Sequence, residues 1–295
     1  MKKTIFKGVA TAIITPLTAE GIDFEAFGRL IDWQIESGIN ALVVCGTTGE
    51  CSTLTDEEHV AAIEFAVKRA NKRVPVIAGT GSNDVAYAVW LTKEAERVGA
   101  DAALLVTPYY NKTTQRGLIA MFEAIADSTD LPLILYNVPS RTGINIEPDT
   151  YVALSKHKNI VAIKEANGNI SKMVETISKL DGALDLYSGN DDQIVPVLAI
   201  GGKGVISVLS NVCPKETVEL CDRFFAGDIK GSMELQKKYN ELISLLFCET
   251  NPIPVKAAMA KLGWCEDFLR LPLVPMESAH REKMFTEMKK LGIID

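Results

Sequence analysis

A lysine at the end of an apolar run is the residue whose position says most about chemistry. Residues 160–163 are Ile, Val, Ala and Ile, and Lys164 follows them directly. Burial disfavours the ammonium form of lysine and lowers its pKa, so a neutral, nucleophilic amine becomes available at physiological pH. The alternative is an ordinary ion pair between Lys164 and Glu165. The position at the end of a run slightly favours the nucleophile.

A tyrosine and an arginine follow the preceding apolar run. Tyr136 closes the run that begins at residue 133, and Arg141 lies shortly after it. A phenol can transfer protons, and a guanidinium can hold a carboxylate through two parallel hydrogen bonds. A packed tyrosine and a surface arginine would give the same pattern, so the residues alone leave both interpretations open.

Three other segments after apolar runs carry small or polar residues. Residues 46–50 (Gly-Thr-Thr-Gly-Glu) could bring backbone N–H groups to a carboxylate, but their spacing alone is more typical of a turn whose threonine caps a helix. The paired tyrosines at 109–110 could present a hydroxyl or simply pack. In residues 188–192, Asp191 and Asp192 are interpreted as caps of the next helix rather than as metal ligands.

The sequence offers little for a metal or an organic cofactor. The histidines, His59, His157 and His280, are far apart, and the six cysteines form no CxxC pair. We expect the cysteines to be reduced, buried and structural. Residues 79–84 match only half of a dinucleotide-binding fingerprint. We therefore expect neither a cofactor nor a metal.

Short apolar runs alternate with helical patterns along the chain, and these elements must position the groups above. The runs lie at residues 9–14, 41–44, 74–78, 102–106, 133–136, 160–164, 184–187 and 204–207. Capping signals such as Thr55 followed by Glu58 mark helix starts between them. About eight βα units favour a closed (β/α)8 barrel, with an open doubly wound sheet as the second choice. Active sites of such barrels form at the carboxyl ends of the strands.

The strand pattern ends near Ser207, and the remaining chain has a helical character. We expect residues 1–225 to form the catalytic barrel and residues 226–295 a C-terminal helical extension. The chain has 295 residues, 47% of them hydrophobic, and a net charge of −7. This composition excludes a disordered chain and argues against nucleic acid or an anionic membrane as a partner. Apolar stretches are too short for a spanning helix or a signal peptide, so we expect a cytoplasmic protein.

Three segments together carry a family resemblance. Residues 46–50, 136–143 and 161–165 resemble the pyruvate-dependent class I aldolase / N-acetylneuraminate lyase superfamily and, within it, the dihydrodipicolinate synthase family. The resemblance extends from Gly8 to the C-terminal helices. N-acetylneuraminate lyases share the lysine and the tyrosine, but they do not typically have the Pro-Ser-Arg-Thr-Gly segment found here at residues 139–143.

The resemblance implies a reaction. Lys164 would form an imine with pyruvate, and the derived enamine would add to L-aspartate 4-semialdehyde to give 4-hydroxy-tetrahydrodipicolinate, the first committed step of lysine and diaminopimelate biosynthesis. Tyr136 would act as general acid and base through a hydroxyl relay with Thr47 and Tyr110. Tyr110 would come from a neighbouring subunit of a homotetramer built as a dimer of dimers.

The resemblance also implies how the substrates are held. Thr48 and the main chain at Ile206 would bind pyruvate, Gly189 would allow close backbone approach, and Arg141 would bind the semialdehyde carboxylate. Neither a metal nor an organic cofactor would be required.

One departure from the family pattern concerns inhibition by lysine. His59 and Asn83 fit the inhibitor pocket, whereas Asp56 and Tyr87 stand where the pattern has histidine and glutamate. Loss of the glutamate removes a carboxylate that would pair with the lysine amino group. We therefore expect feedback inhibition to be weak or absent.

Two other functions stay open. One is a different pyruvate-dependent aldolase, N-acetylneuraminate lyase-like or acting on a sugar acid. The other is a barrel that binds a keto acid and regulates without turnover, which the combination of Lys164, Tyr136 and Thr47 argues against. The sequence does not indicate whether Cys45 or Cys51 affects activity.

Overall fold

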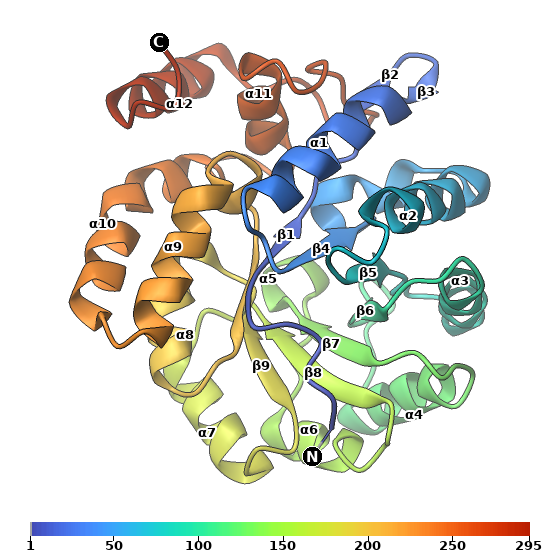
Figure 1. The fold of residues 1–295 in the computed structure, drawn as a ribbon. Coiled ribbons are helices and arrows are strands. Elements are labelled where there is room, and N and C mark those ends of the chain that lie inside the picture. The colour runs from blue at the N-terminus through green and yellow to red at the C-terminus, as the bar shows by residue number, and fades with distance from the viewer. Residues whose placement is uncertain (1) are drawn as a thin grey trace.

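Eight parallel strands close into a barrel in the computed structural model, which describes residues 2–295 (Figure 1). The strands are β1 (Gly8–Ala12), β4 (Ala41–Val44), β5 (Val76–Gly79), β6 (Ala102–Val106), β7 (Leu133–Asn137), β8 (Ile160–Glu165), β9 (Asp185–Ser188) and β10 (Gly204–Ser207). Each strand pairs with the next in parallel, and β10 closes on β1. The predicted (β/α)8 barrel is confirmed, and the open sheet is wrong.

Helices cover the outside of the barrel. They are α1 (Phe24–Glu36), α2 (Asp56–Ala70), α3 (Val85–Arg97), α4 (Gln115–Ala126), α6 (Pro148–Leu154), α7 (Ile170–Leu180), α8 (Ile194–Ala199) and α9 (Pro214–Phe225). One further short helix, α5 (Pro139–Thr142), follows β7 at the mouth of the barrel. The predicted capping box is present, since the Thr55 hydroxyl accepts from the Glu58 N–H and the Glu58 carboxylate accepts from the Thr55 N–H. A short hairpin of β2 (Leu17–Thr18) and β3 (Gly21–Ile22) was not predicted.

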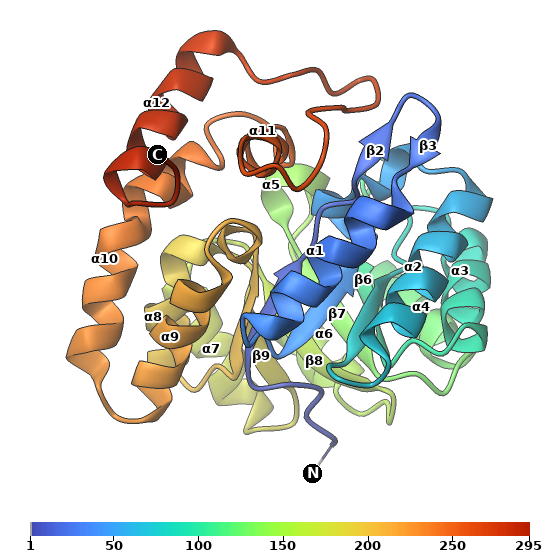
Figure 2. The same cartoon turned by 45° about the horizontal axis from the view of Figure 1, so that its top comes forward.

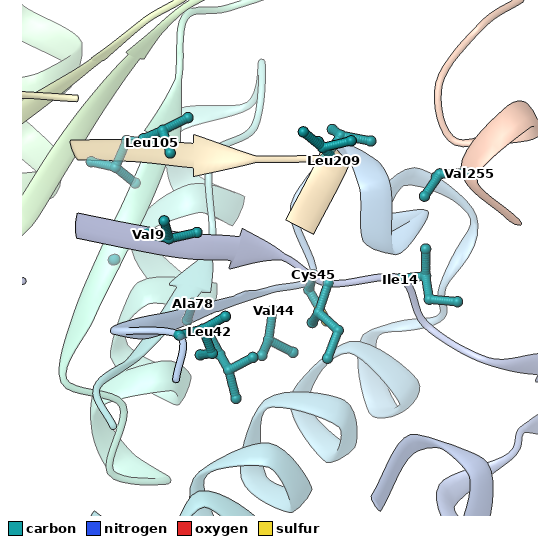
Figure 3. Packing of buried hydrophobic residues seen from close by; sticks show 14 of the residues in the cluster. Val9, Ile14, Leu42, Val44, Cys45, Ala78, Leu105, Leu209 and Val255 are labelled. Atoms are coloured by element: carbon teal, nitrogen blue, oxygen red, sulfur yellow. The ribbon is translucent and has the colours of Figure 1, made fainter. Parts of the chain in front are cut away.

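Alternate residues of the strands face two different cores. Outward residues such as Val9, Leu42 and Val44 pack beneath the helices (Figure 3). The inward residues are often small, as at Ala10, Ala12, Ala41, Ala102 and Ala162. Their small size leaves room inside the barrel for the long side chains at the ends of β7 and β8.

Three helices follow the barrel: α10 (Ile229–Leu245), α11 (Ile253–Lys261) and α12 (Ser278–Lys290). Helix α10 packs on α8 and α9, and α12 packs on α10 and α11. Figures 1 and 2 show α11 and α12 at one end of the barrel, with the start of the chain at the other end. The predicted C-terminal helices are therefore present. Within residues 2–295, no helix is both long enough and apolar enough to cross a membrane.

The cysteines differ partly from the prediction. All six are free, and Cys45, Cys213 and Cys221 are buried. However, Cys248 is exposed, and Cys51 and Cys265 are partly exposed. The prediction that the cysteines are buried is wrong for these three, which lie in the turns after η1, α10 and α11, whereas the buried cysteines belong to the core cluster between the strands and the helices.

Candidate active site

Strand register brings Lys164 and Tyr136 together. The two residues are direct partners in the β7–β8 ladder. Because side chains alternate along a strand, both point into the barrel, as Ile134 and Ala162 do two residues earlier. The Lys164 Nζ lies 4.1 Å from the centroid of the Tyr136 ring. An amine and a phenol therefore share one small enclosed space.

Burial changes the protonation of Lys164. It lowers the pKa of the amine to about 7; the positive charge of Arg141 acts in the same direction, and the carboxylate of Asp191 opposes it. A substantial fraction of the amine is therefore neutral near pH 7, which is the state that attacks a carbonyl.

Glu165 is not the partner of Lys164. It faces outwards, where its carboxylate accepts hydrogen bonds from the Asn137 amide at 2.9 Å, the Tyr151 hydroxyl at 3.0 Å and the Asn167 N–H at 2.9 Å. Burial outweighs these bonds and raises the pKa of Glu165 to about 7. The alternative of a Lys164–Glu165 ion pair is therefore wrong, because adjacent strand residues point to opposite faces.

Tyr136 keeps its proton at neutral pH. Burial raises its pKa to about 12, although Arg141 and a hydrogen bond with Thr47 act in the opposite direction. The phenol is therefore a proton donor that needs a neighbouring group to pass protons onward. Thr47, which forms this hydrogen bond, lies at the start of the 3-10 helix η1 (Thr47–Gly49).

The segment at residues 46–50 does not cap a helix through a threonine. The residue before η1 is Gly46, and no side chain caps this turn. The turn ends at Glu50, which adopts a left-handed conformation with φ 57°. The threonine-cap interpretation is wrong, because the chain tightens into a single 3-10 turn directly after β4, and Thr47 and Thr48 line the barrel mouth instead.

A cavity of about 580 Å³ opens above Lys164 and Tyr136. Thr47, Thr48, Tyr136, Arg141, Lys164 and Gly189 all line it. Ile206 does not border this cavity and is buried in β10. Tyr110 does not border it either, and its side chain is 93% exposed on the surface of this protomer. Six of the eight predicted site residues are thus gathered at one mouth.

Close packing against the end of β8 requires a glycine at position 189. A Cβ at this position would lie 2.8 Å from the Ala166 Cβ, which is closer than side-chain atoms approach. The Gly189 N–H also donates to the Glu165 carbonyl at 2.7 Å. The glycine therefore lets the loop after β9 lie against β8, at the edge of the cavity.

The aspartates after β9 do not act as predicted. Asp191 is buried, and its Oδ2 accepts from the N–H groups of Val208 and Leu209 at 2.9 and 2.8 Å. It therefore fixes the segment after β10 and does not cap α8, because a 3-10 turn (η3, Asp191–Gln193) intervenes. No side-chain cap is found at η3 or α8, so the capping interpretation is wrong for both aspartates.

Sequence reasoning missed Asn251. Its side-chain amide donates to the Thr48 hydroxyl at 3.0 Å, and its carbonyl accepts from the Arg141 guanidinium at 3.1 Å. Its Oδ1 is buried without a hydrogen-bond partner. The only signal in the sequence is a polar residue before the apolar start of α11, far from any strand.

One group of side chains in the described part of the chain has the arrangement of metal ligands. The ligand atoms of Glu249, Glu277 and His280 lie within 4.8 Å of one another. None of the predicted site residues belongs to this group, although Glu249 also borders the cavity.

Comparisons with known proteins all indicate the same family. The model of the Dihydrodipicolinate synthetase family matches residues 5–291. The 4-hydroxy-tetrahydrodipicolinate synthase of Alkaliphilus oremlandii is 54% identical over 290 residues, which is 98% of this chain and 100% of that protein.

Solved structures agree. The dihydrodipicolinate synthase of Aquifex aeolicus is 46% identical with a TM-score of 0.96, covering 98% of this chain and 99% of that one. The chloride-inhibited dihydrodipicolinate synthase of Acinetobacter baumannii, complexed with pyruvate, is 45% identical with a TM-score of 0.96, covering 99% and 100%.

Proposed function

The chain belongs to the dihydrodipicolinate synthetase family, and we propose that Lys164 is the amine with which it performs the reaction of that family. The protein is a class I aldolase-type lyase that condenses pyruvate with L-aspartate 4-semialdehyde to 4-hydroxy-tetrahydrodipicolinate in lysine and diaminopimelate biosynthesis. One observation carries the assignment to Lys164: a buried amine with a pKa of about 7, 4.1 Å from the ring of Tyr136, at the mouth of the barrel.

The chemistry begins with the neutral amine. Lys164 attacks the ketone of pyruvate, and loss of water gives a protonated imine. The imine withdraws electrons, so C3 of pyruvate loses a proton and becomes an enamine. The enamine adds to the aldehyde of the second substrate, and the amino group of that substrate then displaces Lys164 as the ring closes.

Tyr136 would move the protons in these steps. Its high pKa makes it a donor, and Thr47 accepts or returns the proton through its hydroxyl. We propose that Tyr110 of a neighbouring subunit completes this relay, because the Tyr110 side chain of the same protomer lies on the surface.

The substrates would be held by groups around the cavity. Thr48, together with the backbone around it and the main chain at Ile206, would bind the pyruvate carboxylate. Arg141 would bind the carboxylate of the semialdehyde as a guanidinium fork, and Gly189 would allow close approach.

The assembly and the location also belong to the proposal. We infer a homotetramer made of two dimers, in the cytoplasm. We also propose that the catalytic barrel comprises residues 1–225 and the helical extension residues 226–295. The names of the relatives favour the synthase reaction over an N-acetylneuraminate lyase-like or sugar-acid aldolase reaction.

Weak or absent feedback inhibition by lysine is a further part of the proposal. The Tyr87 hydroxyl donates to the Asp56 carboxylate at 2.8 Å. Tyr87 offers no negative charge, and its hydroxyl occupies one oxygen of the Asp56 carboxylate, so an incoming ammonium group would have to compete with this hydrogen bond.

Borohydride reduction in the presence of pyruvate tests the assignment of Lys164. The reduced imine should be found by peptide mass mapping on Lys164, and it should be lost in Lys164→Ala together with turnover. Lys68→Ala is the matched control, because Lys68 is an exposed lysine on α2. An adduct at a different lysine, or a fully active Lys164→Ala protein, would overturn the proposal.

A further inference from the structure

A buried ion pair joins the C-terminal helices to the loop at the barrel mouth. Lys256 lies on α11, and Glu50 follows η1 directly. The Lys256 Nζ is 2.6 Å from the Glu50 Oε1, and neither side chain has any exposed surface. The two residues are far apart in the sequence and come from different parts of the fold.

Every donor of the Lys256 ammonium group is used. Besides Glu50, it donates to the backbone carbonyls of Thr15 at 2.8 Å and Phe268 at 3.2 Å. The second carboxylate oxygen of Glu50 accepts from the Arg270 N–H at 3.4 Å. A buried ion pair must overcome the cost of removing both charges from water, and an apolar pair of similar volume often stabilises a fold as well or better. The ion pair instead fixes the distance and the orientation between α11 and the turn that ends at Glu50.

The ion pair acts on the turn that carries Thr47 and Thr48. Glu50 has a left-handed backbone with φ 57°, which is uncommon for a residue with a side chain. Its N–H donates to the Thr47 carbonyl at 3.1 Å. On the other side of the ion pair, the Thr15 hydroxyl donates to the Gly49 carbonyl at 2.8 Å. Lys256 thus holds both segments that enclose the turn.

A second contact from the same part of the chain reaches the same turn. The Asn251 amide donates to the Thr48 hydroxyl, five residues before Lys256 in the sequence. Asn251 and Lys256, just before and within α11, therefore contact the turn at its middle and at its end.

We propose that Lys256 is a positioning residue for the reaction. Its ion pair with Glu50 keeps Thr47 in hydrogen-bonding contact with Tyr136 and keeps Thr48 at the pyruvate site. Lys256 does not border the cavity, and the partners of its ammonium group are Glu50, Thr15 and Phe268 rather than Lys164. The inference rests on the proposed function, since Thr47 and Thr48 matter only if the relay and pyruvate binding take place there.

The test replaces both charges, so that no unpaired charge stays buried. In the Lys256→Met/Glu50→Gln variant we expect a folded protein whose KM for pyruvate rises about tenfold or more and whose kcat falls about tenfold or more, because small misplacements of positioning groups are costly. At saturating pyruvate, borohydride should still trap the imine on Lys164. Lys261→Met, an exposed lysine of the same helix, should leave both constants unchanged.

The outcomes separate the two proposals. If the wild-type protein gives no adduct on Lys164, the proposed function fails. If it does give the adduct and the folded double variant has the wild-type kcat and KM, the role of Lys256 is refuted. If the double variant does not fold, Glu50→Asp alone decides, because it keeps both buried charges but shortens the side chain that links Lys256 to the turn. Its KM for pyruvate should rise about threefold as the turn shifts, and a wild-type KM would refute the role.

Discussion

In the proposed mechanism, the protonation state of Lys164 controls the first chemical step. Its pKa of about 7 means that the amine is charged and unreactive at lower pH. We therefore expect the rate of imine formation with pyruvate to rise as pH increases through about 7 and then to level off. Rapid-mixing measurements with pyruvate alone, over a range of pH, would give this profile. A midpoint near the ordinary lysine value would contradict it.

Substituting either of two charged neighbours of Lys164 should shift the pH profile, in opposite directions. The positive charge of Arg141 lowers the pKa of Lys164, and the negative charge of Asp191 raises it. Arg141→Gln should therefore shift the profile to higher pH, and Asp191→Asn should shift it to lower pH. Shifts in the same direction would show that electrostatics at the amine is not the cause.

The raised pKa of Glu165 makes the stability of the protein depend on pH. Its pKa is raised from 4.5 to about 7 in the folded protein. Between these two values the native carboxyl holds a proton that the unfolded chain has released, so its contribution to stability falls as pH rises through this window. Glu165→Gln should flatten that decline in urea-unfolding midpoints measured from about pH 4.5 to 7. Glu123→Gln, at an exposed position, should leave the slope unchanged; an unchanged slope in Glu165→Gln would contradict the assignment.

Residues at strand ends could be predicted from the sequence, and residues elsewhere could not. Lys164 and Tyr136 follow apolar runs directly, so a parallel barrel places them at one mouth. Asn251 reaches the same mouth from the turn before α11, and Lys256 reaches the Glu50 carboxylate from α11 itself. No local pattern indicates either contact. Asp191 was misassigned because hydrogen bonds to the distant segment after β10 outweigh its local tendency to cap a helix.

Secondary-structure elements follow the same rule as single residues: those with a local sequence pattern could be predicted, and those without one could not. Strands buried on both faces are continuous apolar runs, so all eight barrel strands were recognisable. The β2–β3 hairpin has two residues in each strand, which is too short for any periodic pattern. The four-residue helix α5, which carries Arg141, is equally short and was not predicted.

Close packing between β4 and β5 gives a prediction for a glycine. A Cβ at Gly79 would lie 2.2 Å from the Cys45 carbonyl oxygen, so Gly79→Ala must push the two strand ends apart. We expect a loss of about 1–3 kcal/mol in the free energy of unfolding, measured in urea. At Gly46 the nearest atom would be 3.6 Å away, so Gly46→Ala should cost less than Gly79→Ala. Equal unfolding midpoints in the two variants would contradict this account.

At the scale of the whole molecule, net charge and site charge have opposite signs. The chain carries a net charge of −7, whereas both proposed substrates carry carboxylates. A local cation is therefore needed where the substrates bind, and Arg141 lies at the cavity with its guanidinium anchored on the Asn251 carbonyl. The turn between α10 and α11 thus orients the one arginine that lines this cavity in the described residues.

The surface of the protomer indicates where a second subunit would be needed. Tyr110, Tyr109 and Trp90 are 93%, 38% and 39% exposed. Tyr110 has a left-handed backbone with φ 68°, and Asn83 holds its loop by donating to the Tyr109 carbonyl. An aromatic side chain fixed in an outward position suits insertion into another copy of the chain.

Mixing two inactive variants tests this arrangement. Lys164→Ala lacks the amine and Tyr110→Ala lacks the proposed relay group, so each should have strongly reduced turnover alone. In a mixed dimer, one site combines an intact Lys164 with an intact Tyr110 from the other subunit. Random reassociation should therefore restore about a quarter of the wild-type activity, because half of the dimers are mixed and each has one complete site. If Tyr110 served the site of its own subunit, no site in the mixture would be complete and no activity would return.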